Sequence, residues 1–131
     1  MKAQVSVEML IIIGIGVAII SIYILYSYNF FYSYKINTDT TITREALEKI
    51  VKNAEFVFRQ GEPARQEINI CLPASIKNCS INNKTLSCSF QDNTQVFYDS
   101  KVNLNGSLPQ TPGCWDLILI SKDNFVEINQ S

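Results

Sequence analysis

The amino-acid sequence predicts an α+β protein, in which a long hydrophobic N-terminal helix precedes a small, disulfide-linked antiparallel β-sheet or sandwich. Residues 9–34 contain no charged side chain, which indicates an unusually apolar helix. Residues 44–58 repeat apolar side chains at helical spacing, so we expect the helix to continue with an amphipathic half. Residues 64–131 contain short β-type runs separated by turn residues, together with all four cysteines.

The composition excludes several classes of function. With 11 Lys and Arg against 12 Asp and Glu the net charge is −1, which argues against a basic nucleic-acid-binding protein. The chain has no histidine, so Ser-His-Asp and Cys-His catalysis and histidine-ligated metal sites are excluded. The acids of the C-terminal half stand singly at turns or strand positions, as on a solvated surface. We therefore expect neither an enzyme nor a bound metal or cofactor.

The charge-free run of 26 residues, 9–34, predicts a retained membrane-spanning helix. It would rise about 39 Å, at about 1.5 Å per residue, whereas a hydrocarbon core is about 30 Å thick. The alternative is a buried helix of a soluble protein, but the remaining residues could hardly cover it. Within the run, Gly14 and Ala18 form a small-xxx-small pair that lets helices approach closely. Aromatic side chains gather at its far end, either as a membrane-interface belt or for packing between helices: Tyr23, Tyr26, Tyr28, Phe30, Phe31, Tyr32 and Tyr34.

Glu8 is the only acidic residue among the first 38. It lies at the start of the apolar run, where an ionised carboxylate is costly unless it is paired or stays in the headgroup layer. An α-amino group at or near the start of the chain is the obvious partner.

The residues around Glu8 resemble those of a known family. The sequence Lys2-Ala3-Gln4-Val5-Ser6-Val7-Glu8-Met9-Leu10 is similar to the start of archaeal type IV pilin precursors, which carry a class III signal peptide. That family shares a basic residue, a small residue, the motif Q-x-S-x-E and an apolar helix; Ala3 stands where Gly is usual. Residues 54–63 and the β-type run up to Pro73 also resemble the stem-to-head junction of those pilins.

The resemblance implies a processing event and a role for Glu8. A prepilin peptidase would cut between Ala3 and Gln4, which makes Glu8 the fifth residue of the mature chain. Loss of Lys2 changes the side-chain charge from −1 to 10 − 12 = −2. In such filaments the new amine and the carboxylate neutralise each other inside a helical core. The residues implied in assembly are Glu8, Ser6, Gly14 and Ala18.

The resemblance also implies four segments and a location for each. Residues 1–3 are the signal peptide, 4–34 the membrane or filament-core helix, 35–62 its amphipathic continuation, and 63–131 an extracytoplasmic β-rich head. The precursor would be a single-pass membrane protein with a cytoplasmic N-terminus. The mature protein would lie in an extracellular surface filament, either as a homo-oligomer or with other pilins, with a role in adhesion. The other implied partner is the prepilin peptidase, and no nucleic acid is expected.

The sequence indicates where the second half of the helix ends, but it leaves open where that half begins. Residues 37–43 are polar and β-branched, and could form a kink, a frayed turn or the start of a second helix. The apolar stripe that follows consists of Leu47, Ile50, Val51, Ala54, Val57 and Phe58. Opposite this stripe, Glu45–Lys49 and Glu48–Lys52 are i,i+4 pairs in the favourable order. Gly61 and Pro63 are expected to end the helix.

Seven β-type runs are expected after the helix. They are Gln66–Leu72, Ile76–Ile81, Lys84–Phe90, Thr94–Tyr98, Lys101–Leu104, Trp115–Ser121 and Phe125–Asn129. Trp115–Ser121 is the most apolar and is expected at the centre of the sheet. Turn residues separate the runs, among them Asn82-Asn83, Asp99-Ser100, Asn105-Gly106 and Asp123-Asn124.

The four cysteines are Cys71, Cys79, Cys88 and Cys114. They contain no C-x-x-C pair, which disfavours a zinc site, and their even number beyond a membrane span favours two disulfides in an oxidising space. We favour Cys79–Cys88 across the Ile76–Phe90 hairpin with Cys71–Cys114. The two other pairings and four buried free thiols stay open as alternatives.

Four Asn-x-Ser/Thr sequons lie in the head, at Asn78, Asn83, Asn105 and Asn129. They fall at expected turns, so surface N-glycosylation is one interpretation and Asn-rich polar loops are the other.

Three functions are considered for a chain with this sequence. The first is a structural filament subunit that is processed before Gln4. The second is an uncleaved single-pass surface protein whose β-rich head binds a ligand or a surface. The third, a membrane-tethered enzyme, would need a carboxylate pair that the sequence does not suggest.

Overall fold

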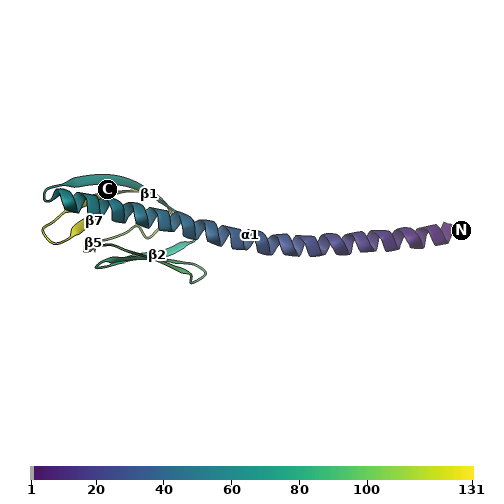
Figure 1. Ribbon diagram of the computed structural model, residues 1–131. Helices are drawn as coiled ribbons and strands as arrows, with labels where there is room; N and C mark the ends of the chain where they lie inside the picture. The colour runs from purple at the N-terminus through teal and green to yellow at the C-terminus, as the bar shows by residue number, and fades with distance from the viewer. Residues whose placement is uncertain (1) are drawn as a thin grey trace. The chain divides into compact units, whose positions relative to one another are not determined.

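The computed structural model describes residues 2–131, and Met1, the first residue of the expected signal peptide, lies outside the described residues. The described chain is an α+β structure in which one helix, α1 (Lys2–Gln60), precedes seven strands (Figure 1). The residues up to Asn37 form an N-terminal unit, and Thr38–Ser131 form a C-terminal unit.

Helix α1 makes up the whole described part of the N-terminal unit. Between residues 9 and 34 the helix contains no proline and no charge, and large apolar side chains occur on every side of it. In residues 2–131, α1 is the one helix that is long and apolar enough to cross a membrane.

The C-terminal unit begins with a helical segment that the sequence left open. Residues 38–43 are helical despite their polar, β-branched composition. Thr43 is fully buried, and its Oγ1 donates a hydrogen bond to the carbonyl oxygen of Asp39 at 2.9 Å. The Asp39 carboxylate in turn accepts a hydrogen bond from Ser75 Oγ at 2.6 Å. Tertiary packing and these bonds therefore outweigh the weak helix propensity of the segment.

The rest of α1 follows the expected pattern. Its buried apolar residues recur at helical spacing and join the core: Ala46, Leu47, Ile50, Val51, Ala54 and Val57. The helix ends at Gln60, and Gly61 takes a left-handed conformation with φ 79° while its N–H donates to the Phe58 carbonyl at 3.1 Å. The predicted stop at Gly61 is confirmed, since glycine adopts this conformation without a Cβ penalty.

The seven strands form two sheets. Their bounds are β1 (Arg65–Leu72), β2 (Ile76–Asn82), β3 (Thr85–Phe90), β4 (Gln95–Asp99), β5 (Leu104–Gly106), β6 (Gly113–Ser121) and β7 (Val126–Gln130). The first sheet has the order β1-β6-β7-β5 and the second β2-β3-β4. The expected runs start and end within 3 residues of these strands, so the alternation of apolar runs and turn residues located all the strands except β5.

Strand β5 corrects the expectation of a wholly antiparallel head. It pairs with β7 in parallel, Leu104 opposite Val126 and Gly106 opposite Ile128, whereas all the other strand pairs are antiparallel. Asn105 and Gly106, expected in a turn, lie within this short strand. Gly106 has φ 122°, and a Cβ at this position would collide with the Ile128 carbonyl oxygen, so the parallel crossing requires glycine.

Strand β6 lies between β1 and β7, which confirms its expected central position. Leu117 and Leu119 on β6 are fully buried, as is Ile128 on β7. They belong to one core cluster with the buried face of α1 and the inner residues of β2, β3 and β4. In Figure 1 the C-terminal turns of α1 lie with β1 on one side and β2 on the other. Each fully buried Leu or Ile contributes about 1.5–3 kcal/mol, so this shared core holds the C-terminal unit together.

Candidate functional site

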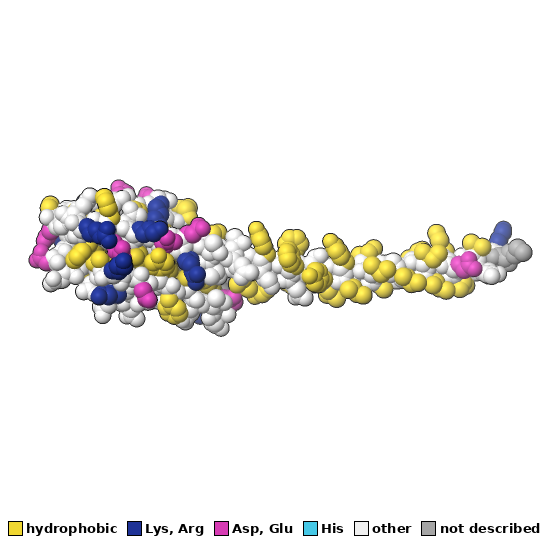
Figure 2. Space-filling model, viewed as in Figure 1, with side chains coloured by type: hydrophobic (Ala, Val, Ile, Leu, Met, Phe, Trp, Pro, Cys, Tyr) yellow, Lys and Arg dark blue, Asp and Glu magenta, His cyan; other side chains and the backbone are white. Residues whose placement is uncertain are grey.

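The surface of the N-terminal unit is predominantly hydrophobic from Met9 to Tyr34. Its large apolar and aromatic side chains between Val5 and Tyr34 are exposed by 53% at Ile13 up to 72% at Tyr26 and Tyr28. Figure 2 shows hydrophobic side chains along this unit, whereas the charged side chains gather on the C-terminal unit. Because each such side chain gains about 1.5–3 kcal/mol on leaving water completely, a surface of this kind is covered by lipid or by protein.

Glu8 is the one acidic side chain of the described N-terminal unit. It is exposed, and no ion pair involves it within residues 2–131. Gln4 lies one helical turn before it on the same face of α1, and Ser6 lies in the same exposed turn. Ala3 and Gln4, the expected processing positions, both lie in the exposed first turn of α1.

The small residues of α1 leave room along the helix. A Cβ added at Gly14 or at Gly16 would meet no atom within 4 Å. Gly14 and Ala18 are four residues apart and therefore share a face. This face can accept the side chains of a neighbouring helix at a short distance, as small-xxx-small pairs do.

The aromatic residues at the far end of the apolar run are all exposed, from Tyr23 to Tyr34. Phe30 and Phe31 contact edge to face, with ring centroids 6.2 Å apart. Their exposure fits either role expected from the sequence, because a membrane interface and a packed helix bundle both receive aromatic side chains.

Two disulfides link strands of the C-terminal unit. Cys71 on β1 is bonded to Cys114 on β6, and Cys79 on β2 is bonded to Cys88 on β3. This is the pairing favoured from the sequence. In both cases the two cysteines are direct cross-strand partners, with Cα atoms 4.0 and 4.1 Å apart. The first disulfide is exposed, whereas Cys79 and Cys88 are only 2% and 1% exposed.

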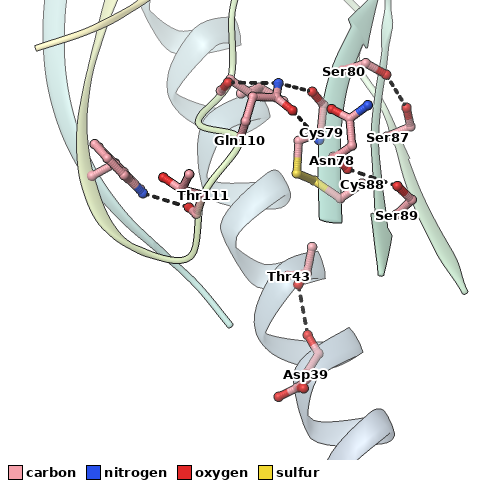
Figure 3. The surroundings of a disulfide bond; sticks show 12 residues. Asp39, Thr43, Asn78, Cys79, Ser80, Ser87, Cys88, Ser89, Gln110 and Thr111 are labelled. Carbon is pink, nitrogen blue, oxygen red and sulfur yellow. Dashed lines mark hydrogen bonds between the residues drawn. A yellow bond between two sulfur atoms is a disulfide. The ribbon is translucent and has the colours of Figure 1, made fainter. Parts of the chain in front are cut away.

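A glutamine side chain protects the outer edge of β2 beside the buried disulfide (Figure 3). Gln110 Nε2 donates to the Cys79 carbonyl at 2.6 Å, and the Cys79 N–H donates to Gln110 Oε1 at 3.2 Å. The side-chain amide thus satisfies the same two backbone groups that a further strand would use. The edge of β2 is therefore blocked at Cys79 against pairing with another chain.

The four sequons lie in different settings. Asn83, with φ 50°, occupies the turn between β2 and β3. Asn78, Asn105 and Asn129 lie within β2, β5 and β7, so the expectation that all four lie at turns is wrong for these three. Asn78, Asn83 and Asn105 are exposed, while Asn129 is partly buried and donates to Glu127 Oε1 at 3.1 Å.

Polar contacts that the sequence did not reveal connect α1 with later residues of the C-terminal unit. Lys49 Nζ donates to the Asn69 carbonyl at 2.6 Å, and Glu55 Oε1 accepts from the Lys101 N–H at 3.2 Å. Lys49 therefore does not form the expected pair with Glu45. The expected Glu48–Lys52 pair is present, and its hydrogen bond and charge raise the pKa of Lys52. Because Lys52 is largely exposed, that pair adds little stability.

The comparisons with known proteins return nothing. No protein-family model, curated protein or solved structure matches the chain. Within residues 2–131 no group of three or more His, Cys, Asp or Glu side chains is arranged to hold a metal ion. The features of this chain that bear on its function are therefore the exposed apolar helix, Glu8 and the disulfide-linked C-terminal unit.

Proposed function

We propose that this chain is a structural subunit, pilin or pilin-like, of an archaeal type IV pilus-like surface filament. The observation that carries the proposal is the exposed apolar surface of residues 9–34, preceded within one turn by the lone carboxylate of Glu8. A helix that is apolar on all sides must be covered all round, first by lipid and then by other helices. The folded C-terminal unit would be the surface-exposed head.

Before assembly, the helix would anchor the precursor in the cell membrane with its N-terminus in the cytoplasm. It has 26 uncharged residues, and a helix needs about 20 residues to cross a hydrocarbon core of about 30 Å. Two disulfides in the C-terminal unit support an oxidising, extracytoplasmic location for that unit.

Processing between Ala3 and Gln4 would prepare the chain for assembly. The cut would remove Lys2 and create a new amine at Gln4, one helical turn from Glu8. Transfer of the helix from lipid to other helices changes apolar burial little, so close packing at Gly14 and Ala18 and the pairing of Glu8 with an amine would fix the register. The partners are then further copies or other pilins, and the prepilin peptidase.

The start of the mature chain tests the proposal. The protein is purified from the cell surface and from membranes, and its N-terminus is determined by mass spectrometry and sequencing. We expect a chain that begins at Gln4 and is recovered in filaments visible by electron microscopy. A chain that begins at Met1 in both fractions would contradict the proposal and favour the uncleaved surface-binding protein.

A matched pair of variants sharpens this test. The small residue at the cut is replaced in Ala3→Leu, which we expect to block processing and filament formation, and in Ala3→Gly, which we expect to be processed at least as well as the wild type. Equal processing of both variants would show that a peptidase reading a small residue at this position is not involved.

A further inference from the structure

The head surface contains a cavity of about 470 Å³ that is lined mainly by asparagine. We propose that this amide-lined cavity binds a neutral saccharide. Its polar lining consists of Asn82, Asn83, Asn103, Asn105 and Asn124. The volume lies in the range of about 300–1,000 Å³ that small-molecule sites occupy. The proposal goes beyond filament assembly and does not depend on it.

The chemistry of the lining selects the class of ligand. The residues that line the cavity include no Asp, Glu, Lys or Arg, so a charged ligand would lose its hydration without gaining a counter-charge. Each asparagine side chain offers two donor hydrogens and one acceptor oxygen. Neighbouring sugar hydroxyls, each both donor and acceptor, match this combination.

All five asparagine side chains keep hydrogen-bonding groups that a ligand could use. The side chains of Asn82, Asn83 and Asn124 make no hydrogen bond within residues 2–131. Asn103 Nδ2 makes only a long bond of 3.4 Å to the Asn124 carbonyl. Asn105 uses its Oδ1 to accept the Gly106 N–H at 2.8 Å, which leaves its amino group available.

An apolar wall complements the amides. Phe125, Ile81 and Leu104 line the same cavity, and Phe125 and Ile81 are partly exposed. A pyranose ring has an apolar C–H face beside its hydroxyl rim, and an aromatic ring presents a face of negative charge density to such C–H groups. Polar and apolar parts of one sugar unit would thus both find partners.

The walls of the cavity are held together by backbone hydrogen bonds. The Leu104 N–H donates to the Asn83 carbonyl at 2.7 Å, which ties β5 to the turn between β2 and β3. The Val126 N–H donates to the Asn103 carbonyl at 2.9 Å, which ties the start of β7 to the segment before β5. Three segments far apart in the sequence are therefore fixed before any ligand arrives, and the ordering cost of binding is small.

The saccharide can come from two sources. Asn83 and Asn105 are also the acceptor residues of two sequons, so a glycan attached to the chain itself would begin at the cavity wall. The other source is a glycan of a foreign surface or molecule. Both present the same neutral hydroxyl chemistry, and the experiment below separates them.

The test uses the full chain from a host without N-glycosylation, in an amine-oxide detergent that carries no sugar headgroup. Glucose, galactose, mannose and N-acetylglucosamine are titrated separately, with glucuronate and inorganic phosphate as charged counterparts. Binding is followed by ¹H–¹⁵N NMR on the backbone and asparagine side-chain amides. We expect saturable shifts confined to the cavity for at least one neutral sugar, and weaker or absent shifts for the charged probes.

Variants assign the shifts to the cavity. Asn82→Ala and Asn124→Ala each remove one unpaired amide, and we expect about tenfold weaker binding, the factor for one net hydrogen bond. Asn78→Ala is the matched control, because Asn78 is an exposed asparagine of the same strand as Asn82 but does not line the cavity. Absence of saturable shifts with all four sugars, equal binding by the alanine variants, or tighter binding of a charged probe would overturn the proposal.

The source is then determined with protein from a glycosylating archaeal host. The double variant Thr85→Val/Ser107→Ala destroys the sequons at Asn83 and Asn105 and retains both asparagines. If free sugar binds the wild type and the double variant equally, the ligand is external. If it binds only the double variant, the chain's own glycan occupies the cavity. Failure of either assay leaves the N-terminal processing test unaffected, so the two proposals fail separately.

Discussion

At the scale of single residues, Glu8 links the N-terminal helix to assembly. Its carboxylate is exposed and unpaired within residues 2–131, a state that water tolerates. Between packed helices the same carboxylate would lose its hydration, and an unpaired buried charge costs about 3–5 kcal/mol. In the proposed filament, the amine created at Gln4 by cleavage is the cation that removes this cost.

The first prediction concerns Glu8→Gln. This variant keeps the size of the side chain but removes the charge, so the amine in the filament would stay unpaired. We expect the C-terminal unit to fold normally and filament yield to fall by at least about tenfold, because even 1.4 kcal/mol lost per contact has that effect. Filaments are counted by electron microscopy and subunits quantified by mass spectrometry.

The control for this prediction is Glu45→Gln, which removes an exposed carboxylate of α1 that takes part in no ion pair within the described chain. It should assemble like the wild type. Normal filament yield from Glu8→Gln would show that the carboxylate has no role in assembly.

Other single-residue contacts show what the sequence could not predict. Local spacing suggested that Lys49 pairs with Glu45, yet its ammonium reaches the Asn69 carbonyl, 20 residues away. The contacts of Asp39 with Ser75 and of Glu55 with the Lys101 N–H join residues 36 and 46 positions apart. Such contacts depend on how the helix packs against the strands, and a spacing rule for one helix face contains no information about it.

At the scale of elements, most of the fold followed from local chemistry. The stop of α1 at Gly61 and the positions of all strands except β5 were predicted, because helix ends and turns need particular residues. Strand β5 was misjudged, since its three residues are too few for a pattern and its parallel pairing with β7 joins segments that are distant in sequence. The amide-lined cavity was missed for the same reason, as three separate segments form it.

The second prediction separates the two disulfides by their accessibility. A reductant attacks sulfur atoms directly, so the exposed Cys71–Cys114 bond should react before the buried Cys79–Cys88 bond. The folded protein is treated briefly with a mild reductant, alkylated and analysed by peptide mass spectrometry. We expect early labels on Cys71 and Cys114, and labels on Cys79 and Cys88 only under conditions that unfold the C-terminal unit. Equal labelling of all four cysteines in the folded protein would contradict this order.

At the scale of the whole molecule, the two units differ in whether their apolar side chains are buried within the chain. Every buried apolar residue of the described chain lies at or beyond Ala46, in the C-terminal unit. The N-terminal unit contributes large exposed apolar side chains, a surface of the kind that lipid or protein covers. This division was predictable, because the separation of uncharged residues 9–34 from the charged remainder is visible in the sequence itself.

The third prediction follows from this division. A chain that starts at Thr38 retains the complete core cluster, both disulfides and the Asp39–Ser75 hydrogen bond. We expect it to be monomeric in water without detergent and to unfold cooperatively, whereas the full chain requires detergent. Size-exclusion chromatography and thermal unfolding followed by circular dichroism measure both properties.

A second truncation is the control, because it removes buried residues of α1 that the first truncation keeps. A chain that starts at Asn53 loses Thr43, Ala46, Leu47, Ile50 and Val51, all buried in the C-terminal unit. At about 2–5 kcal/mol for each large side chain removed from a core, the loss is comparable with the usual stability of about 5–15 kcal/mol for a whole domain. The shorter chain should therefore aggregate or stay unfolded. If the chain from Thr38 failed in the same way, residues before 38 would contribute to folding, and the helix could not serve purely as the assembly surface of an independently folded head.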